Sequence, residues 1–436
     1  MQGHGPCPPE ALLPAEKPSQ IRQIAGGAAG NLVEWFDWYA YSAFALYFAP
    51  RFFPDGDPLA QALNTAGIFA IGFLMRPIGG WLLGVYADRA GRKAALTLSV
   101  TMMCAGSLMI ALAPTYASIG LWAPVLLLVA RLVQGLSVGG EYGASATFMA
   151  EVAEEKRRGF LASFQYVTLI GGQLLAIGLL VLLQGVMDEA ALEAWGWRIP
   201  FVIGASLAVM VFWLRKGLVE TEAFEAEAAK AERAHPVKTL LQHPKPLLIV
   251  LALTAGGSLA FYTFTTYMQK YLVLSAGWTK VDATRVSAMT LVVYMLLQPV
   301  FGALSDRIGR RPMLIAFGVL GTLLTIPVMT ALGQVSDPMT GFILIMAALT
   351  VLSSYTSISG LVKAEMFPAS VRALGVGLPY GVAVALFGGS AEFVAFAFIR
   401  AGNESGFFWY VSIMCAVALA AALALPDTKR HSLIDG

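Results

Sequence analysis

Several acidic and polar side chains stand inside a stretch of sequence that is otherwise apolar. Between residues 24 and 49 they are Asn31, Glu34, Asp37 and Tyr41, at spacings of three and four. A helix with that spacing places them on one face. Carboxylates in apolar surroundings favour their protonated forms unless water or a cation faces them. Glu34 and Asp37 are therefore candidates for binding and releasing a proton, and the alternative is a structural role with an arginine as partner.

Two arginines stand in comparable surroundings. Arg76 lies near the middle of the second long apolar stretch, and Arg131 shares one helical face with Gln134 and Glu141 in the fourth. An arginine keeps its charge there, so it must pair with an acid of the protein or with an anionic ligand. Both uses stay open for Arg131, and ligand contact is favoured for Arg76. Glu141 is a third candidate for proton binding.

The second half of the chain carries polar residues in apolar stretches of its own. Lys270 would add a third buried cation, and Glu392 is an acid that needs a partner such as Lys270. Many neighbouring Ser and Thr residues can donate hydrogen bonds to the carbonyl groups of their own helix, so their presence is weaker evidence for a binding cavity. We expect four uncharged side chains and one lysine to line a binding cavity: Tyr41, Tyr262, Gln269, Gln298 and Lys270.

Composition places all of these residues in a membrane protein. The chain is 57% hydrophobic and 13% charged, with a mean hydropathy of +0.69, whereas about a quarter of residues are charged in soluble domains. Apolar runs of about 20 residues can cross a bilayer as helices. Such runs predict an all-α protein of twelve transmembrane helices, near residues 24–49, 62–86, 94–114, 124–148, 160–184, 197–214, 246–270, 285–304, 312–332, 340–362, 372–400 and 406–425.

The distribution of these runs predicts two bundles of six helices. We expect an N-terminal tail over residues 1–20, a first bundle over 21–214, a linker over 215–245, a second bundle over 246–425 and a C-terminal tail over 426–436. Most of the 29 Lys and Arg residues fall on the side of the tails, which predicts that both termini are cytoplasmic. The positive residues are spread over several loops and form no single patch, so nucleic-acid binding is not expected.

A short charged loop occurs once in each half of the chain. GVYADRAGRK at residues 84–93 reappears as GALSDRIGRR at 302–311, which indicates an internal duplication. We call the two copies the first latch (Gly84, Asp88, Arg89, Gly91 and Arg92) and the second latch (Gly302, Asp306, Arg307, Gly309 and Arg310). A single such loop could be a plain cytoplasmic connection, but two copies in register favour a breakable contact between helices.

The composition of the latches suggests how each contact is made. Gly84 and Gly302 allow helices to approach closely, while Gly91 and Gly309 permit a tight reversal with positive φ. Each aspartate can then face the N-terminus of a neighbouring helix, where the helix dipole favours an anion. The arginines can bridge to acidic groups or lipid phosphates.

Other chemistry is poorly supported. The three cysteines and four histidines have no metal-ligand spacing, and the histidines all lie in the tails or the central linker. No nucleophile triad or cofactor loop is visible. We therefore expect no enzyme activity, no metal and no cofactor.

These motifs resemble the major facilitator superfamily. The duplicated loop is similar to the loop motif of that superfamily, and RLVQGLSVGGEYG at residues 131–143 resembles the fourth-helix motif of its metabolite:proton symporter branch. GNLVEWFDWY at 30–39, FLMRPIGGW at 73–81 and FGGSAEFVA at 387–395 are similar to members of the same branch. The resemblance runs from about residue 20 to about residue 425.

The resemblance implies two pseudo-symmetric six-helix bundles in a bacterial inner membrane. It also implies proton-coupled import of α-ketoglutarate, or of a closely related dicarboxylate, by alternating access. With the residues above, it predicts that Arg76, Arg131 and Lys270 clamp the substrate while Asp37, Glu34 or Glu141 takes a proton. The expected partners are a small organic acid, protons and the lipid bilayer, and the chain is expected to be monomeric.

Three alternatives stay open. The cargo could be another organic acid, such as shikimate or citrate, or a zwitterion such as betaine. Three candidate cations favour an acid over a zwitterion. A protein of another class is also possible: a membrane sensor that retains the fold but does not transport a substrate.

Overall fold

A computed structural model describes residues 20–54, 56–90, 92–139, 146–147, 150, 153–216, 240–368, 371–426 and 432–434. Within these ranges it leaves aside the side chains of 20–31, 84, 87–90, 92–93, 95–96, 155, 208 and 211–216. The described residues form helices and connecting segments, without a β-strand among them.

The first half, up to residue 216, is built from long helices and a few short ones. The long ones are α1 (Gln20–Phe52), α2 (Pro58–Ala90), α3 (Arg92–Ala111), α5 (Trp122–Val138), α8 (Phe164–Val186) and α10 (Ile199–Lys216). The short ones are α4 (Tyr116–Ile119), η1 (Glu155–Arg157), α7 (Arg158–Ala162), which leads into α8, α9 (Glu189–Ala194) and η2 (Gly196–Arg198).

The second half, from residue 240, follows the same plan with three interrupted helices. The uninterrupted ones are α15 (Lys280–Ile308), α16 (Arg310–Leu332) and α21 (Glu404–Ala424). The interrupted ones are α13 (Pro244–Tyr262) with η3 (Thr263–Tyr267) and α14 (Met268–Leu274), α17 (Pro338–Thr356) with α18 (Ser359–Glu365), and α19 (Arg372–Ala383) with η4 (Val384–Gly388) and α20 (Ala391–Arg400).

Helices occur at all twelve predicted spans. Three of them begin a few residues before the predicted run, at a polar residue that caps the helix. Thr279, Asp337 and Asn403 each accept a hydrogen bond from a backbone N–H in the first turn of the helix that follows. Eight helices in the described part are long and apolar enough to cross a membrane, and the apolar segments Thr97–Ala111 and Trp122–Val138 are shorter.

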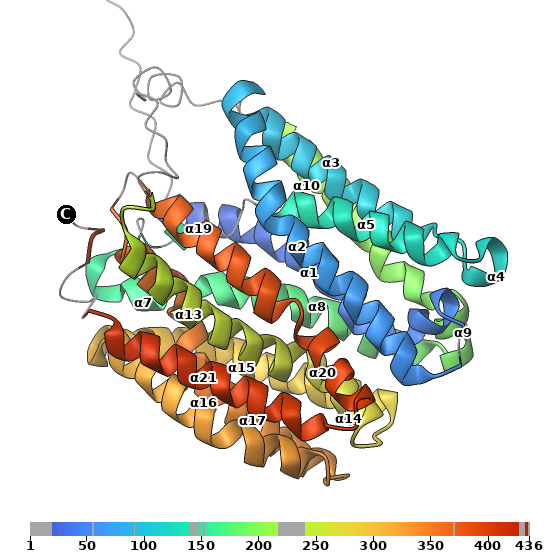
Figure 1. Ribbon diagram of the computed structural model, residues 1–436. Helices are drawn as coiled ribbons and strands as arrows, with labels where there is room; N and C mark the ends of the chain where they lie inside the picture. The colour runs from blue at the N-terminus through green and yellow to red at the C-terminus, as the bar shows by residue number, and fades with distance from the viewer. Residues whose placement is uncertain are drawn as a thin grey trace, which may run out of the picture.

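The long helices lie alongside one another, with their connections at two opposite ends (Figure 1). Within the first half, α1 contacts α8, α2 contacts α5 and α3 contacts α10. Within the second half, α21 contacts α13 and α16, and α17 contacts α15 and α16. The halves meet chiefly where α7 and α8 contact α15 and where α2 contacts η4 and α20.

Glycines bring α2 and α5, the two helices that carry the arginines, into backbone contact. A Cβ atom at Gly135 would collide with the carbonyl oxygen of Gly72, and one at Gly139 would collide with that of Arg76. Small residues at a spacing of four allow such packing between membrane helices. The position of Arg76 relative to Arg131 therefore depends on these glycines.

This contact gives a stability prediction. Gly135→Ala should lower stability by about 1–3 kcal/mol, because the added methyl group overpacks the α2–α5 contact. Gly178 in α8 has nothing within 4 Å of an added Cβ, so Gly178→Ala should be neutral or stabilising by about 0.5–1 kcal/mol. Thermal unfolding of the purified proteins in detergent measures both. An unfolding midpoint for Gly135→Ala at or above that of Gly178→Ala would contradict the prediction.

Candidate functional site

Asp37 is the buried acid of the first half. Its side chain is on α1 and only 1% of the residue is exposed. Ser107 Oγ on α3 donates to Oδ1, and Gln134 Nε2 on α5 donates to Oδ2 at 2.8 Å. The Oε1 atom of Gln134 in turn accepts a hydrogen bond from Arg131 Nη1 at 2.9 Å. The acid and the arginine are therefore connected through Gln134.

Arg76 and Arg131 both stand over the indole ring of Trp38. Their Cζ atoms lie 4.1 and 3.9 Å from the ring centroid, and the two residues are 6% and 0% exposed. Cation–π contact offsets part of the cost of burying these charges. Among the residues that the structure describes, the buried Nε and Nη2 atoms of both arginines have no hydrogen-bond partner. Such donors are costly to leave unpaired, and they suit a carboxylate.

Lys270 and Glu392 form the charged centre of the second half. Lys270 Nζ lies 2.7 Å from Glu392 Oε1, with both side chains buried. The pairing predicted from the sequence is thus confirmed. Ser42 of α1 joins the pair, because its Oγ accepts a hydrogen bond from Lys270 and donates one to Glu392 Oε1 at 3.0 Å.

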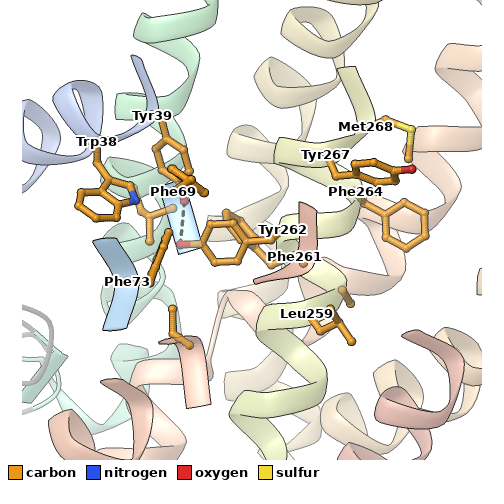
Figure 2. Packing of buried hydrophobic residues seen from close by; sticks show 14 of the residues in the cluster. Trp38, Tyr39, Phe69, Phe73, Leu259, Phe261, Tyr262, Phe264, Tyr267 and Met268 are labelled. Atoms are coloured by element: carbon orange, nitrogen blue, oxygen red, sulfur yellow. Dashed lines mark hydrogen bonds between the residues drawn. The ribbon is translucent and has the colours of Figure 1, made fainter. Parts of the chain in front are cut away.

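Aromatic side chains connect the arginine site of the first half to the second half. The hydroxyl of Tyr39 on α1 donates to that of Tyr262 at 3.4 Å, and Phe73 on α2 packs edge to face against Tyr262 (Figure 2). Arg76 Cζ lies 4.3 Å from the Phe73 ring centroid. Arg76 is therefore next to the interface between the halves and away from lipid.

Neighbouring residues of helix α1 contact both charged centres. Trp38 and Tyr41 contact Arg131, whose Cζ is 4.5 Å from the Tyr41 ring centroid. Tyr39 and Ser42 contact the second half. Sequence analysis did not single out Trp38 or Ser42; their only signal is their place beside Asp37 and Tyr41.

Four predicted binding or proton-coupling residues remain: Gln269, Gln298, Glu34 and Glu141. Gln269 Nε2 donates to Thr284 Oγ1 at 3.0 Å, and Gln298 bonds to Tyr294 and Thr356 between α15 and α17. The hydrogen bonds found for these two glutamines are thus chiefly within the second half. Glu34 is buried in α1. Glu141 lies outside the described residues.

Two π-helical segments border the site. η3 directly precedes α14, which carries Gln269 and Lys270, and η4 ends at Gly388. A Cβ atom at Gly388 would press on Tyr262, and one at Gly389 on Phe73. π-Helical turns occur frequently at functional sites, and these two shape the aromatic contact between the halves.

In the second latch, Asp306 lies at the N-terminus of a neighbouring helix, as the sequence predicted. Asp306 accepts hydrogen bonds from the backbone N–H groups of Gly159 and Phe160, at 2.8 and 2.9 Å, at the N-terminus of α7. Arg310 Nη1 lies 3.1 Å from Asp306, and Arg310 Nε lies 3.5 Å from Glu365 Oε1. This places a carboxylate of the second half on a helix end of the first.

The glycines of the second latch also follow the prediction. Gly309 has a φ of 95°, and a Cβ atom at Gly302 would press on the carbonyl oxygen of Gly159. Arg307 is exposed. In the first latch, Gly91 and the side-chain positions of Gly84, Asp88, Arg89 and Arg92 lie outside the described residues.

Removing the charge of Asp306 should loosen this end of the interface. In Asp306→Asn the interaction with the helix dipole and with Arg310 weakens by about 1 kcal/mol, a change of roughly fivefold in the opening equilibrium. The readout is the rate at which maleimide labels a cysteine placed at Ala162, in a cysteine-free background. Asp337→Asn, which alters the helix cap of α17, is the matched control. Equal labelling rates in the two variants would argue against the latch.

A second set of polar contacts joins the halves beyond α8. Lys280, at the start of α15, lies 2.7 Å from Glu189 and 2.9 Å from Glu193 of α9. Within the first half, Arg51 Nε donates to the Glu193 carbonyl oxygen at 2.8 Å and so holds α9 against α1. Sequence analysis missed this contact. The halves are thus bridged at both ends of α8.

The segment 432–434 contacts the latch end of the molecule. Leu433 N donates to the Glu365 carbonyl oxygen, and Arg372 Nη2 donates to that of Leu433. Ile434 packs against a small apolar cluster that contains residues of both halves, namely Ala146, Ala150, Ala162, Leu361, Ala364 and Val376.

Comparisons with known proteins agree with this arrangement. A family profile described as "Sugar (and other) transporter" matches residues 25–238 and again 213–435, one match for each half. The α-ketoglutarate permease of Escherichia coli K12 is 57% identical over 414 residues, which cover 95% of each chain. A citrate-proton symporter of Klebsiella pneumoniae is 34% identical over 94% of each chain.

A solved structure shows the same fold at lower identity. The xylose transporter XylE of E. coli, in a partially occluded inward-open conformation, superposes with a TM-score of 0.72 at 18% identity, covering 93% of this chain and 96% of that one. The expected architecture of twelve helices in two six-helix bundles is therefore confirmed. The chain belongs to the sugar (and other) transporter family of the major facilitator superfamily, and it is a transporter and not an enzyme.

Proposed function

We propose that this protein is a proton-coupled symporter that imports α-ketoglutarate, or a closely related dicarboxylate, by alternating access. The proposal rests chiefly on the two buried arginines, whose Nε and Nη2 donors have no hydrogen-bond partner within the described ranges. A substrate carboxylate would satisfy them in bidentate fashion. The 57% identity to the E. coli α-ketoglutarate permease supports the same substrate.

Proton coupling is assigned to the acids that lie near these cations. Asp37 is connected to Arg131 through Gln134. Protonation of Asp37 would make Arg131 more available to a substrate anion, so proton and substrate would bind together. Carrying negative charge inward against a membrane potential costs about 2.3 kcal/mol per charge at 100 mV, and a co-transported proton reduces this cost.

We further propose the setting of the transporter. It resides in a bacterial inner membrane with both termini cytoplasmic, and it works as a monomer with the lipid bilayer around it. The second latch then closes the cytoplasmic end, while Lys280 with Glu189 and Glu193 bridges the periplasmic end.

Uptake into membrane vesicles tests the function. Labelled α-ketoglutarate should accumulate when an inward proton gradient is imposed and should only equilibrate without one. Excess succinate should block uptake, and excess betaine should not. Uptake that does not depend on the proton gradient would refute symport. The absence of any α-ketoglutarate uptake would favour a sensor.

Other organic acids form the second candidate. Curated relatives at 30–34% identity include a citrate-proton symporter, a shikimate transporter and proline/betaine transporters. Three buried cations, Arg76, Arg131 and Lys270, favour an acid with two carboxylates over a zwitterion. Competition by citrate or shikimate in the same vesicles separates these substrates from α-ketoglutarate.

A further inference from the structure

The Lys270–Glu392 pair has an unusual position for a structural ion pair. Both side chains are nearly inaccessible, at 2% and 4% exposure, and both come from the second half. A serine of the first half, Ser42, bonds to both of them. The pair is therefore in direct contact with the surface along which the two halves must separate.

The surroundings of Glu392 connect it to the arginine site. The titratable groups that face it are Lys270 on α14, Tyr267 on η3 and Tyr41 on α1. Tyr41 also contacts Arg131 through its ring. Glu404, on the adjacent α21, faces Tyr267. Tyr41 of α1 is thus near both Arg131 of the first half and Glu392 of the second.

The chemistry of Lys270 limits what it can bind. Its ammonium group already has a carboxylate oxygen at 2.7 Å and the Ser42 hydroxyl as partners. A second carboxylate can join only if Glu392 gives way, because two acids on one buried lysine would leave a net negative charge in apolar surroundings. A buried carboxylate that loses its cation is strongly disfavoured unless it takes up a proton.

We propose that Glu392 is a second proton-binding acid, which holds Lys270 until the distal carboxylate of the substrate replaces it. This inference rests on the proposed dicarboxylate transport. In the exchange, the substrate carboxylate bonds to Lys270 Nζ while Glu392 takes one proton from the water on the open side and becomes neutral. Ser42 loses its link to Glu392, which frees α1 from the second half. On release of the substrate the proton leaves and the Lys270–Glu392 pair forms again.

Glu392→Gln tests the proton step in proteoliposomes. The affinity for α-ketoglutarate should depend less on pH in the variant than in the unaltered protein. Across the same pH range, the change in affinity should be at least about tenfold smaller. Exchange of labelled for unlabelled substrate should continue, at an altered rate, while gradient-driven accumulation should fall at least about fivefold. Asp337→Asn, which removes an exposed charge at the N-terminus of α17, is the matched control. Unchanged accumulation and pH dependence in Glu392→Gln would overturn the proposal.

A charge-balanced variant tests the carboxylate exchange should Glu392→Gln fail to fold. Lys270→Gln/Glu392→Gln removes both charges of the pair and so leaves neither partner as an unpaired buried charge. The unaltered protein should prefer α-ketoglutarate over 2-oxopentanoate, which lacks the distal carboxylate, and in the double variant this ratio should fall at least about tenfold. An unchanged ratio would overturn the role of Lys270. If the unaltered protein transports neither compound, the proposed function itself fails.

Discussion

Arg131→Gln is expected to lower the affinity for α-ketoglutarate by roughly 30-fold to several thousand-fold. Truncating one partner of a buried, hydrogen-bonded charge pair costs about 2–5 kcal/mol. Arg131 is fully buried, and its Nε and Nη2 donors have no hydrogen-bond partner in the described part of the chain. Glutamine retains a polar group but neither the charge nor the planar fork that matches a carboxylate. Binding of labelled substrate to the purified protein gives the affinity directly.

Two further variants serve as comparisons for Arg131→Gln. Arg131→Lys retains the charge and loses the bidentate geometry, so its affinity should fall between those of the other two proteins. Arg400→Gln, at the exposed end of α20, should bind as the unaltered protein does. An affinity for Arg131→Gln equal to that of Arg400→Gln would remove Arg131 from the substrate site.

Asp37→Asn is expected to abolish gradient-driven accumulation while substrate exchange stays measurable. Asparagine cannot take up a proton. Its amide nitrogen would also face one of the two donors, Ser107 or Gln134, which now bond to the two carboxylate oxygens. The ratio of internal to external substrate in proteoliposomes should drop to the value found without a pH gradient. The measurement is the steady-state level of labelled α-ketoglutarate at a fixed imposed gradient.

Ser107→Ala is the control for a purely structural effect. It removes one hydrogen bond from Asp37 and leaves the acid and Gln134 in place. Accumulation should persist in this variant, with a shift in its pH dependence. If Ser107→Ala loses accumulation as completely as Asp37→Asn, Asp37 acts in packing and not as a proton carrier.

Sequence patterns were most informative where burial leaves a side chain few choices. A lysine and an acid in separate apolar stretches need a partner, and the pairing of Lys270 with Glu392 was predictable on that ground. Asp306 at a helix N-terminus was predictable because the repeated loop combines a carboxylate, glycines and arginines. The helices followed from the lengths of the apolar runs.

Contacts that depend on which helices face each other were not predictable in this way. Trp38 is one aromatic residue among many in α1, and only the fold places it beneath both arginines. Ser42 carries no signal of burial or charge, yet it reaches the ion pair of the other half. The Lys280 contact with α9 joins segments about 90 residues apart, which no periodicity within a single helix encodes.

The contact of residues 432–434 affects how this protein can be labelled. Leu433 is tied to Glu365 and Arg372, and Ile434 rests on alanines of the first half as well as residues of the second. A fluorescent protein or purification handle fused directly after this segment would be anchored at the seam, where its bulk could hinder rocking. A generous flexible spacer is therefore advisable, and transport rates measured with a short one should be compared with those of the untagged chain.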